Sequence, residues 1–388
     1  MADSVRTVAL LGATGSIGVQ TLDVLRRSPE QFRLVAIAGG TRVKELVAIA
    51  REFQVELICV LSEHDASDVR SQLPNAHVLI GDEGLQHVAQ SADVIVNAVV
   101  GFAGLTATLS ALQAGKRLAL ANKESLVAAA PLVDQVRATI PTDLVPIDSE
   151  HCAIHQCLAG ADHTAGYPGV KRLLLTASGG PFRTKSKAEL EHVTKADALN
   201  HPTWSMGPKI TIDSSTLMNK GLEVLEAAAL FGIGVERVDV VVHPQSIVHS
   251  MVEYVDGSTL AQLSHPDMRL PIAYCLGLPE RLDHGWGAIS FEESLTLSFE
   301  PPNREAFPAL DLAYAAGRSG GAAPAWLSAA NEVAVDAFLQ DRIAWRDIVP
   351  IVASTMDQLN ATPMRTVEEL REHDQTARRI AAKMVASL

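Results

Sequence analysis

Two short segments carry side chains suited to binding a metal ion. Asp148 and Glu150 lie two positions apart, directly after a short apolar run that predicts a buried strand. In extended backbone, alternate side chains point the same way, so both carboxylates would project at the carboxyl end of a parallel strand. Adjacent carboxylates repel unless a cation separates them, and Mg²⁺ or Mn²⁺ prefers such oxygen ligands. Taken alone, the pair is more typical of a helix N-cap with charged neighbours.

The second segment places three polar side chains on one face of a predicted helix, Ser215–Phe231. Asn219, Lys220 and Glu223 are spaced by three and four residues, and Glu226 follows one turn later. An amide, an ammonium and a carboxylate on one face could bind a metal and a phosphorylated polyol together. The alternative is an ordinary Lys–Glu pair on a solvent-exposed helix face.

A glycine-rich loop follows the first predicted strand. Gly12, Gly15 and Gly18 give the spacing GxxGxxG, which allows a tight turn and close approach of a pyrophosphate to a helix N-terminus. The alternative is a glycine-rich turn without a ligand. After the second strand, NAD-binding domains usually have Asp or Glu, whereas this chain has Thr41 and Arg42. Arginine matches the oxygens of a 2′-phosphate, which favours NADPH, unless Arg42 is simply solvated.

For these residues to lie close together, the fold must bring the carboxyl ends of several strands to one edge of a sheet. The first 150 residues alternate apolar runs with helical patterns such as Val43–Phe53 and Thr106–Ala114, which predicts a doubly wound parallel sheet. The predicted strands are Val8–Leu11, Arg33–Ala38, Leu57–Val60, His77–Ile80, Asp93–Val99, Arg117–Ala121 and Leu144–Ile147.

The remaining chain predicts a second and a third kind of structure. Lys171–Ala177, Val238–His243 and Ile247–Val255 look like strands, and the long aperiodic stretch Ser178–Pro208 suggests a mobile lid. We therefore expect an α/β protein with four parts. They are an N-terminal Rossmann-type domain (1–148), a central α+β catalytic domain (149–285, loop about 178–208), a connector (286–307) and a C-terminal α-helical bundle (308–388).

Composition narrows the function classes. The 388 residues include 32 basic and 45 acidic side chains, a formal net charge of −13, which argues against a general nucleic-acid partner. Apolar runs stay well short of the roughly 18 residues that a membrane span needs, so no membrane partner is expected. The four cysteines lack paired spacing and predict reduced thiols in a cytoplasmic protein.

Longer blocks connect these motifs to a known family. GATGSIG (12–18), LANKESLV (120–127), IDSEH (147–151), TASGGPFR (176–183), and the blocks at 201–227, 243–254 and 266–279 follow one another in family order. The chain resembles the 1-deoxy-D-xylulose 5-phosphate reductoisomerases. The resemblance implies NADPH- and metal-dependent rearrangement and reduction of that small phosphorylated sugar to 2-C-methyl-D-erythritol 4-phosphate, in isoprenoid precursor synthesis. It also implies a homodimer built through the central domain.

The resemblance assigns roles to individual positions. The implied metal ligands are Asp148, Glu150 and Glu223, and the implied catalytic set adds Lys123 and His201. Other implied substrate contacts are Ser149, Ser178, Trp204, Ser214, Asn219 and Lys220, with Met206 and His249 beside them. The implied NADPH contacts are Thr14, Gly15, Ser16, Ile17, Gly40, Thr41, Arg42, Ala98, Asn122, Glu124, Gly207 and Met268.

The sequence departs from the family pattern at two places, and two other functions compete with the one that the resemblance implies. Thr41-Arg42 differs from the family's usual residues after the second strand, and His163–Val170 resembles a surface insertion. Another Rossmann-type dehydrogenase is one competitor, although an acylating enzyme would need a catalytic cysteine in a loop. An NADP-sensing regulator is the other, but a sensor needs neither a metal nor a phosphate site.

Overall fold

The computed structural model describes residues 5–162, 166–204, 206–360 and 363–388. Its contacts divide the chain into two compact units. The first unit comprises Met1–Ser125, Val133–Cys152 and Asp267–Gly287, and the second comprises Leu126–Leu132, Ala153–Pro266 and Ala288–Leu388. Residues 267–287 thus pack with the N-terminal sheet, whereas the sequence placed 267–285 in the central domain and 286–287 in the connector.

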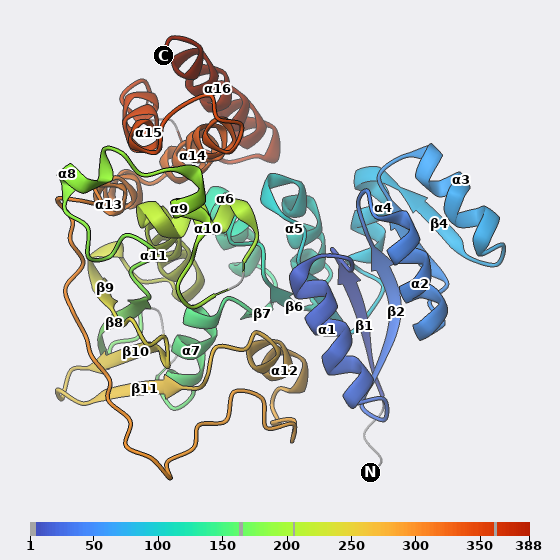
Figure 1. Ribbon diagram of the computed structural model, residues 1–388. Coiled ribbons are helices and arrows are strands. Elements are labelled where there is room, and N and C mark those ends of the chain that lie inside the picture. The colour runs from blue at the N-terminus through green and yellow to red at the C-terminus, as the bar shows by residue number, and fades with distance from the viewer. Residues whose placement is uncertain (1–4, 163–165, 205, 361–362) are drawn as a thin grey trace. The chain divides into compact units, whose positions relative to one another are not determined.

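The first unit contains a seven-stranded parallel sheet (Figure 1). Its strand order is β4-β3-β2-β1-β5-β6-β7, so the order reverses between β1 and β5, where ligands bind in doubly wound sheets. All seven predicted strands are confirmed within two residues. They are β1 (Arg6–Leu11), β2 (Phe32–Ala38), β3 (Leu57–Val60), β4 (His77–Ile80), β5 (Val94–Asn97), β6 (Arg117–Leu120) and β7 (Asp143–Pro146).

Helices connect these strands and bury the sheet. Val8, Leu10 and Val96 in the strands form one core with Leu22, Leu25 and other apolar residues of the helices. The added helix α12 packs on α1 and contributes Ile272 and Leu276 to this core, which explains its place in the unit. The helices are α1 (Ser16–Arg27), α2 (Val43–Phe53), α3 (Glu63–Gln72), α4 (Gly81–Val88), η1 (Gly101–Gly104), α5 (Leu105–Gln113), α6 (Lys123–Arg137) and α12 (Arg269–Gly277).

The second unit is built on a four-stranded mixed sheet with the order β11-β10-β8-β9 (Figure 1). β8 (Val170–Ala177) pairs parallel with β9 (Val238–Val242) and antiparallel with β10 (Val248–Tyr254). A turn at Asp256 and Gly257 leads into β11 (Thr259–Leu263), an edge strand that the sequence pattern did not predict. Its five residues are largely exposed, so they lack the apolar run that reveals a buried strand.

One predicted helix of the second unit is wrong. Residues 215–231 form two helices, because Leu217 adopts a left-handed conformation (φ 60°) between α10 (Pro208–Thr216) and α11 (Met218–Phe231). The remaining helices include the predicted C-terminal bundle. They are α7 (Ser149–Cys157), α8 (Lys187–Leu190), α9 (Lys195–Leu199), η2 (Val235–Arg237), α13 (Ala309–Ser319), α14 (Ala323–Leu339), η3 (Trp345–Asp347), α15 (Ile348–Met356) and α16 (Val367–Ala386).

No helix among the described residues is long and apolar enough to cross a membrane.

Candidate active site

The glycine-rich loop after β1 is shaped for close backbone approach. Gly12 has a positive φ of 82°, and a Cβ there would lie 2.5 Å from the Ala98 oxygen at the end of β5. A Cβ at Gly18 would lie 2.4 Å from the Gly12 oxygen. Gly15 is the N-cap of α1 and offers no side chain, so the backbone N–H groups from Ser16 onward face the loop uncapped. Such a helix start binds phosphate groups.

Arg42 lies beside this loop. Its guanidinium donates a hydrogen bond to the Thr14 carbonyl and forms an ion pair with Glu45 at 3.1 Å. Arg42 is therefore held against the loop and is not an isolated solvated side chain, although about half of it remains exposed. Thr41 is exposed and Gly40 half-buried at the same strand end. A cation next to a phosphate-binding loop suits a nucleotide that carries an additional phosphate.

The other predicted cofactor contacts lie outside the glycine-rich loop, at several places in both units. Asn122 is buried and caps α6: its amide donates to the Gly101 oxygen (2.6 Å) and to Val99, and accepts from the Ser125 N–H (2.6 Å). Its side chain thus joins the loop after β5 to the start of α6. Three of the other predicted contacts, Ala98, Glu124 and Met268, are half-buried in the first unit, whereas Gly207 is the exposed N-cap of α10 in the second.

The geometry expected for Asp148 and Glu150 is wrong in one respect. β7 ends at Pro146 and α7 begins at Ser149, so Glu150 lies in the first turn of a helix and not in extended backbone. Ser149 donates from its hydroxyl to Glu150 Oε2 at 2.6 Å. The pair therefore lies at a strand-to-helix junction, the position that the helix N-cap alternative described. Such a junction still belongs to the carboxyl edge of the sheet.

Asp148 is nearly buried, and a cation compensates its charge. Lys123 Nζ lies 2.5 Å from Oδ2, and the Nδ1 of buried His151 lies 3.2 Å from Oδ1. Burial acts to raise the pKa of Asp148, but Lys123 and His151 outweigh it and hold that pKa well below its usual value. Oδ1 nevertheless accepts no well-aligned hydrogen bond from the described residues. An ionised, buried carboxylate oxygen without a donor fits a divalent-metal ligand.

A pair of glycines lies between Ser178 and Ser214 in the second unit: Gly180 N–H donates to Ser178 Oγ, and Gly180 lies against Ser214. Ser178 follows β8, and Gly179 and Gly180 both have positive φ (84° and 67°). A Cβ at Gly180 would lie 2.6 Å from the Ser214 oxygen and 3.5 Å from its Oγ. The sequence prediction omitted Gly180, although a glycine pair directly after a strand signals such an approach. Both serines are half-buried, so their hydroxyls remain within reach of a ligand.

Asn219, Lys220 and Glu223 come together at the start of α11. Asn219 Nδ2 donates to Glu223 Oε1 at 2.5 Å, and Lys220 forms a hydrogen-bonded ion pair with Oε2. Lys220 and Glu223 are only 4% and 1% exposed, which excludes an ordinary pair on a solvated helix face. A buried pair of this kind must be well compensated, because desolvation of both charges is costly.

His201 connects the two ends of the segment 178–208, which the sequence predicted as aperiodic and which contains the short helices α8 and α9. Its Nδ1 accepts hydrogen bonds from the backbone N–H groups of Thr203 (3.2 Å) and Trp204 (2.9 Å). A neutral ring must then carry its proton on Nε2, which donates to Ser178 Oγ at 3.1 Å. Burial lowers the pKa of His201 and favours this neutral form. Trp204 lies near buried His249, with ring centroids 6.2 Å apart.

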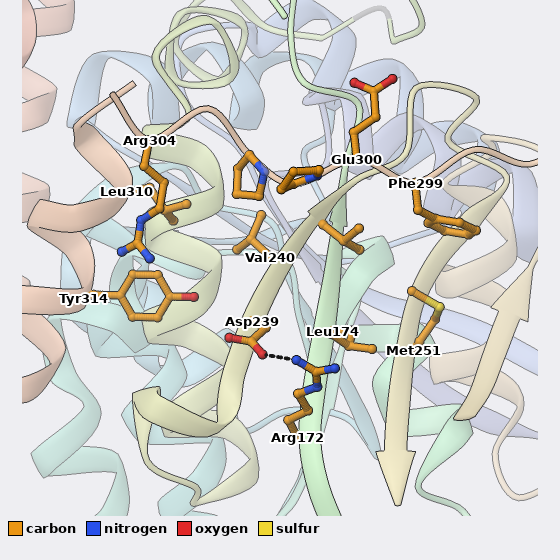
Figure 2. Close-up of a pocket in the computed structure, with 13 residues that line it drawn as sticks. Arg172, Leu174, Asp239, Val240, Met251, Phe299, Glu300, Arg304, Leu310 and Tyr314 are labelled. Atoms are coloured by element: carbon orange, nitrogen blue, oxygen red, sulfur yellow. Dashed lines mark hydrogen bonds and ion pairs between the residues drawn. The ribbon is translucent and has the colours of Figure 1, made fainter. Parts of the chain in front are cut away.

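The second unit also has an open pocket of about 540 Å³. Figure 2 shows Leu174, Val240 and Met251 of the sheet beneath residues 299–304 of the connector, with the ion pair Arg172–Asp239 at its floor. Leu174 faces the pocket, whereas its neighbours in β8 are buried on the other face. None of the predicted site residues lines it, so the pocket is separate from the cluster around Ser178.

Comparisons with known proteins agree along the whole chain. Three family models match: 1-deoxy-D-xylulose 5-phosphate reductoisomerase over residues 8–130, its C-terminal domain over 144–231, and the DXP reductoisomerase C-terminal domain over 263–380. A 1-deoxy-D-xylulose 5-phosphate reductoisomerase of Bacillus cereus is 48% identical over 383 residues, which cover 98% of this chain and all of the relative.

Solved structures are similar along almost the whole chain. The reductoisomerase of Zymomonas mobilis in complex with NADPH superposes with a TM-score of 0.93 at 42% identity, covering 99% of this chain and all of that one. A structure described as DOX-P reductoisomerase with NADPH, fosmidomycin and magnesium gives 0.92 at 43% identity, covering 98% of both chains.

Proposed function

The chain belongs to the 1-deoxy-D-xylulose 5-phosphate reductoisomerase family, and from that premise we propose that it converts 1-deoxy-D-xylulose 5-phosphate to 2-C-methyl-D-erythritol 4-phosphate. NADPH and Mg²⁺ are its cofactors. The observation that carries this function is the similarity at 48% identity along 98% of the chain, which includes every predicted site segment. The competing dehydrogenase and sensor functions do not account for it.

NADPH binding belongs to the loop after β1. The uncapped start of α1 supplies N–H groups for the pyrophosphate, and Arg42 beside Thr14 supplies the cation for the 2′-phosphate. The remaining cofactor contacts follow the family pattern. Asn122 acts indirectly in this proposal, because its side-chain atoms already hold the loop between β5 and α6.

Asp148, Glu150 and Glu223 are the proposed metal ligands. When bound, Mg²⁺ acts as a Lewis acid toward substrate oxygens, and Mn²⁺ would serve the same role. Glu223 is buried and contacts Lys220 and Asn219, whereas Lys123 contacts Asp148. Lys123 and His151 hold the pKa of Asp148 below its usual value, so this carboxylate is ionised and ready to ligate.

The substrate's phosphate is assigned to Ser178, Ser214, Asn219 and Lys220. Ser178 Oγ accepts hydrogen bonds from His201 and from the Gly180 N–H (3.2 Å), so its own proton is free to be donated to a phosphate oxygen. If Glu223 ligates the metal, Lys220 and Asn219 would exchange part of their interaction with Glu223 for the phosphate. This exchange would couple phosphate binding to metal binding.

Lys123, His201 and Trp204 complete the proposed site. Lys123 orients the reacting oxygens, and Ser149 contacts the substrate from the start of α7. His201 joins the lid segment to the phosphate loop, so phosphate binding would stabilise lid closure and exclude water. Water exclusion matters because the carbon skeleton is rearranged before the reduction.

We assign the homodimer contact to the mixed sheet of the second unit. Several large apolar side chains of this region are exposed, among them Leu260 in β11 and Phe291 and Phe299 in the connector. The open edge of β11 and the pocket of Figure 2 offer unpaired backbone and apolar surface to a second copy. A cytoplasmic location stays a prediction from the cysteine pattern.

Product analysis tests the proposed function. The purified protein is incubated with 1-deoxy-D-xylulose 5-phosphate, NADPH and Mg²⁺, and the product is identified by NMR while NADPH absorbance is followed. We expect one 2-C-methyl-D-erythritol 4-phosphate for each NADPH consumed. NADPH binding without turnover by the folded, metal-loaded protein would support the sensor alternative and refute the enzyme.

A further inference from the structure

Helix α10 exposes one hydroxyl between buried neighbours. Within residues 211–217, all of which the structure describes, only Ser214 is partly exposed. Asp213 and Ser215 on either side are each 1% exposed, and both are hydrogen-bonded to residues of the C-terminal region. The buried contacts of Asp213 and Ser215 therefore determine which side chain of α10 faces the loop that contains Ser178.

Asn331 holds Asp213 from helix α14, which packs against α10 (Figure 1). Its Nδ2 donates to Asp213 Oδ1 at 2.7 Å, while Lys209 Nζ lies 2.9 Å from Oδ2. Asn331 is completely buried, and its own Oδ1 accepts no hydrogen bond from the described residues. An unsatisfied buried acceptor is unfavourable, so an apolar residue would suit packing better. The amide is explained by its bond to the carboxylate.

Trp345 holds the other neighbour. Its Nε1 donates to Ser215 Oγ at 2.8 Å, and Ser215 in turn donates to the Ile212 oxygen at 2.7 Å. The same ring packs edge-on against Phe182, with centroids 5.5 Å apart. Phe182 follows Gly180 by two residues, so one indole supports both α10 and the loop that carries Ser178.

We propose that Asn331 and Trp345 are positioning residues for the phosphate of the substrate. Through Asp213 and Ser215 they fix the rotation of α10 about its axis, which keeps the Ser214 hydroxyl directed at the Gly179–Gly180 loop. A turn of α10 by one residue would bring the Asp213 carboxylate toward the phosphate, where like charges repel. This inference rests on the proposed function, because it takes Ser178 and Ser214 as phosphate ligands.

Two substitutions test the proposal in the full-length protein. Asn331→Leu removes the donor to Asp213 at similar volume, and Trp345→Phe removes the N–H but keeps an aromatic ring. Inorganic phosphate is titrated as a competitor of the substrate. We expect its inhibition constant and the substrate's KM to rise roughly tenfold, as for a weakened hydrogen bond to a charged group. The Kd of NADPH should change less than about twofold, within the scatter of indirect effects.

Matched controls separate positioning from general stability. Glu332→Gln disrupts the ion pair with Arg378 (2.6 Å) one residue along α14, and Trp326→Phe removes the indole bond to His373 (3.1 Å). Both substitutions remove bonds between α14 and α16, and neither bond involves a residue of α10. We expect them to lower the melting temperature and to leave phosphate inhibition unchanged.

The outcomes distinguish this inference from the proposed function. If all four variants lose stability but bind phosphate like the wild type, the two residues are merely structural and the inference is wrong. The same conclusion follows if the controls weaken phosphate binding as much as Asn331→Leu does. Absence of turnover in the wild type would instead refute the proposed function.

Discussion

A single imidazole joins the backbone of residues 203–204 to Ser178, a proposed phosphate ligand. His201 accepts two backbone N–H groups on Nδ1, which leaves no room for a proton there, and its Nε2 donates to Ser178. The ring must therefore be neutral for this arrangement to persist. Burial supports the neutral form by lowering the pKa of His201.

This arrangement predicts a pH dependence of substrate binding. With the pKa lowered from 6.5, a released lid takes up a proton more readily than the closed lid. The closed arrangement is thus fully stable above the ordinary histidine pKa and is weakened as the pH falls below it. We expect the substrate's KM to rise roughly two- to tenfold on acidification through this range. His201→Gln should remove this component; wild-type and variant profiles that run parallel would contradict the prediction.

Gly180 allows the loop that carries Ser178 to approach Ser214 of α10 closely. We predict that Gly180→Ala weakens phosphate binding, because the new Cβ would lie 2.6 Å from the Ser214 oxygen at a positive φ. The strain should lower the free energy of unfolding by about 1–3 kcal/mol. Gly257→Ala is a suitable control, since its φ is also positive but no atom lies within 4 Å. Equal effects on phosphate inhibition in both variants would refute a specific role for Gly180.

At the residue scale, the sequence supplied identities better than geometry. The family resemblance marked Ser178, Ser214 and Glu223, but no periodicity predicts that Gly180 joins the serines. The spacing of Asp148 and Glu150 misled, because a strand-to-helix junction replaces the expected extended backbone. That junction depends on where β7 ends within the folded sheet, which local sequence does not specify.

At the scale of elements, the break between α10 and α11 shapes the proposed phosphate site. Leu217 adopts a left-handed conformation that costs a residue with a Cβ about 1–2 kcal/mol, and it is 4% exposed. Burial of its side chain contributes about 2–3 kcal/mol and offsets that strain. The break changes the direction of the chain between Ser214 and Asn219, so residues of both helices can contact one phosphate.

The break between the helices predicts that, at Leu217, a glycine variant is more stable than an alanine variant, which reverses the usual order within a helix. Leu217→Gly and Leu217→Ala both lose the apolar side chain, but only glycine relieves the strain. We expect the glycine variant to be more stable by about 1 kcal/mol in denaturant unfolding. At Leu222, within regular helix, alanine should instead be the more stable substitution by about the same amount. Identical rankings at both positions would contradict the account of the break.

The sequence predicted those helices and strands whose buried residues follow a regular pattern. Apolar runs located the strands of the parallel sheet, because both faces of such a sheet are covered. The same signal failed for β11, whose side chains are mostly exposed at a sheet edge. It also failed at Leu217, because a leucine in an apolar helical pattern gives no sign of a left-handed residue.

At the scale of the whole molecule, the residues of the proposed site divide between the two units. The first unit contains the glycine-rich loop, Lys123 and Asp148, and the second contains Ser178, Ser214 and Glu223. The C-terminal helices belong to the second unit and contact α10, which a division into independent domains does not reveal. Sequence patterns predicted that these helices exist, but not that Asn331 binds Asp213, because that pair is 118 residues apart.

The exposed sheet face predicts the oligomeric state. Met251 lines the pocket on this face, so Met251→Glu would place a charge in the proposed contact between two copies. We expect the wild type to be a dimer in light scattering at micromolar concentration and the variant to be mainly monomeric. Val19→Glu, an equivalent change on exposed α1, should remain dimeric. A monomeric wild type, or a dimeric Met251→Glu, would contradict the assignment of this face.

The metal dependence of turnover tests the central claim most directly. NADPH oxidation with 1-deoxy-D-xylulose 5-phosphate is measured with Mg²⁺, with EDTA, and with Mg²⁺ restored, for the wild type and for Asp148→Asn and Glu223→Gln. We predict reversible loss of wild-type activity in EDTA and a loss of at least about a hundredfold in both folded variants. Undiminished turnover in EDTA, or near wild-type rates in the variants, would contradict the proposed metal-dependent site.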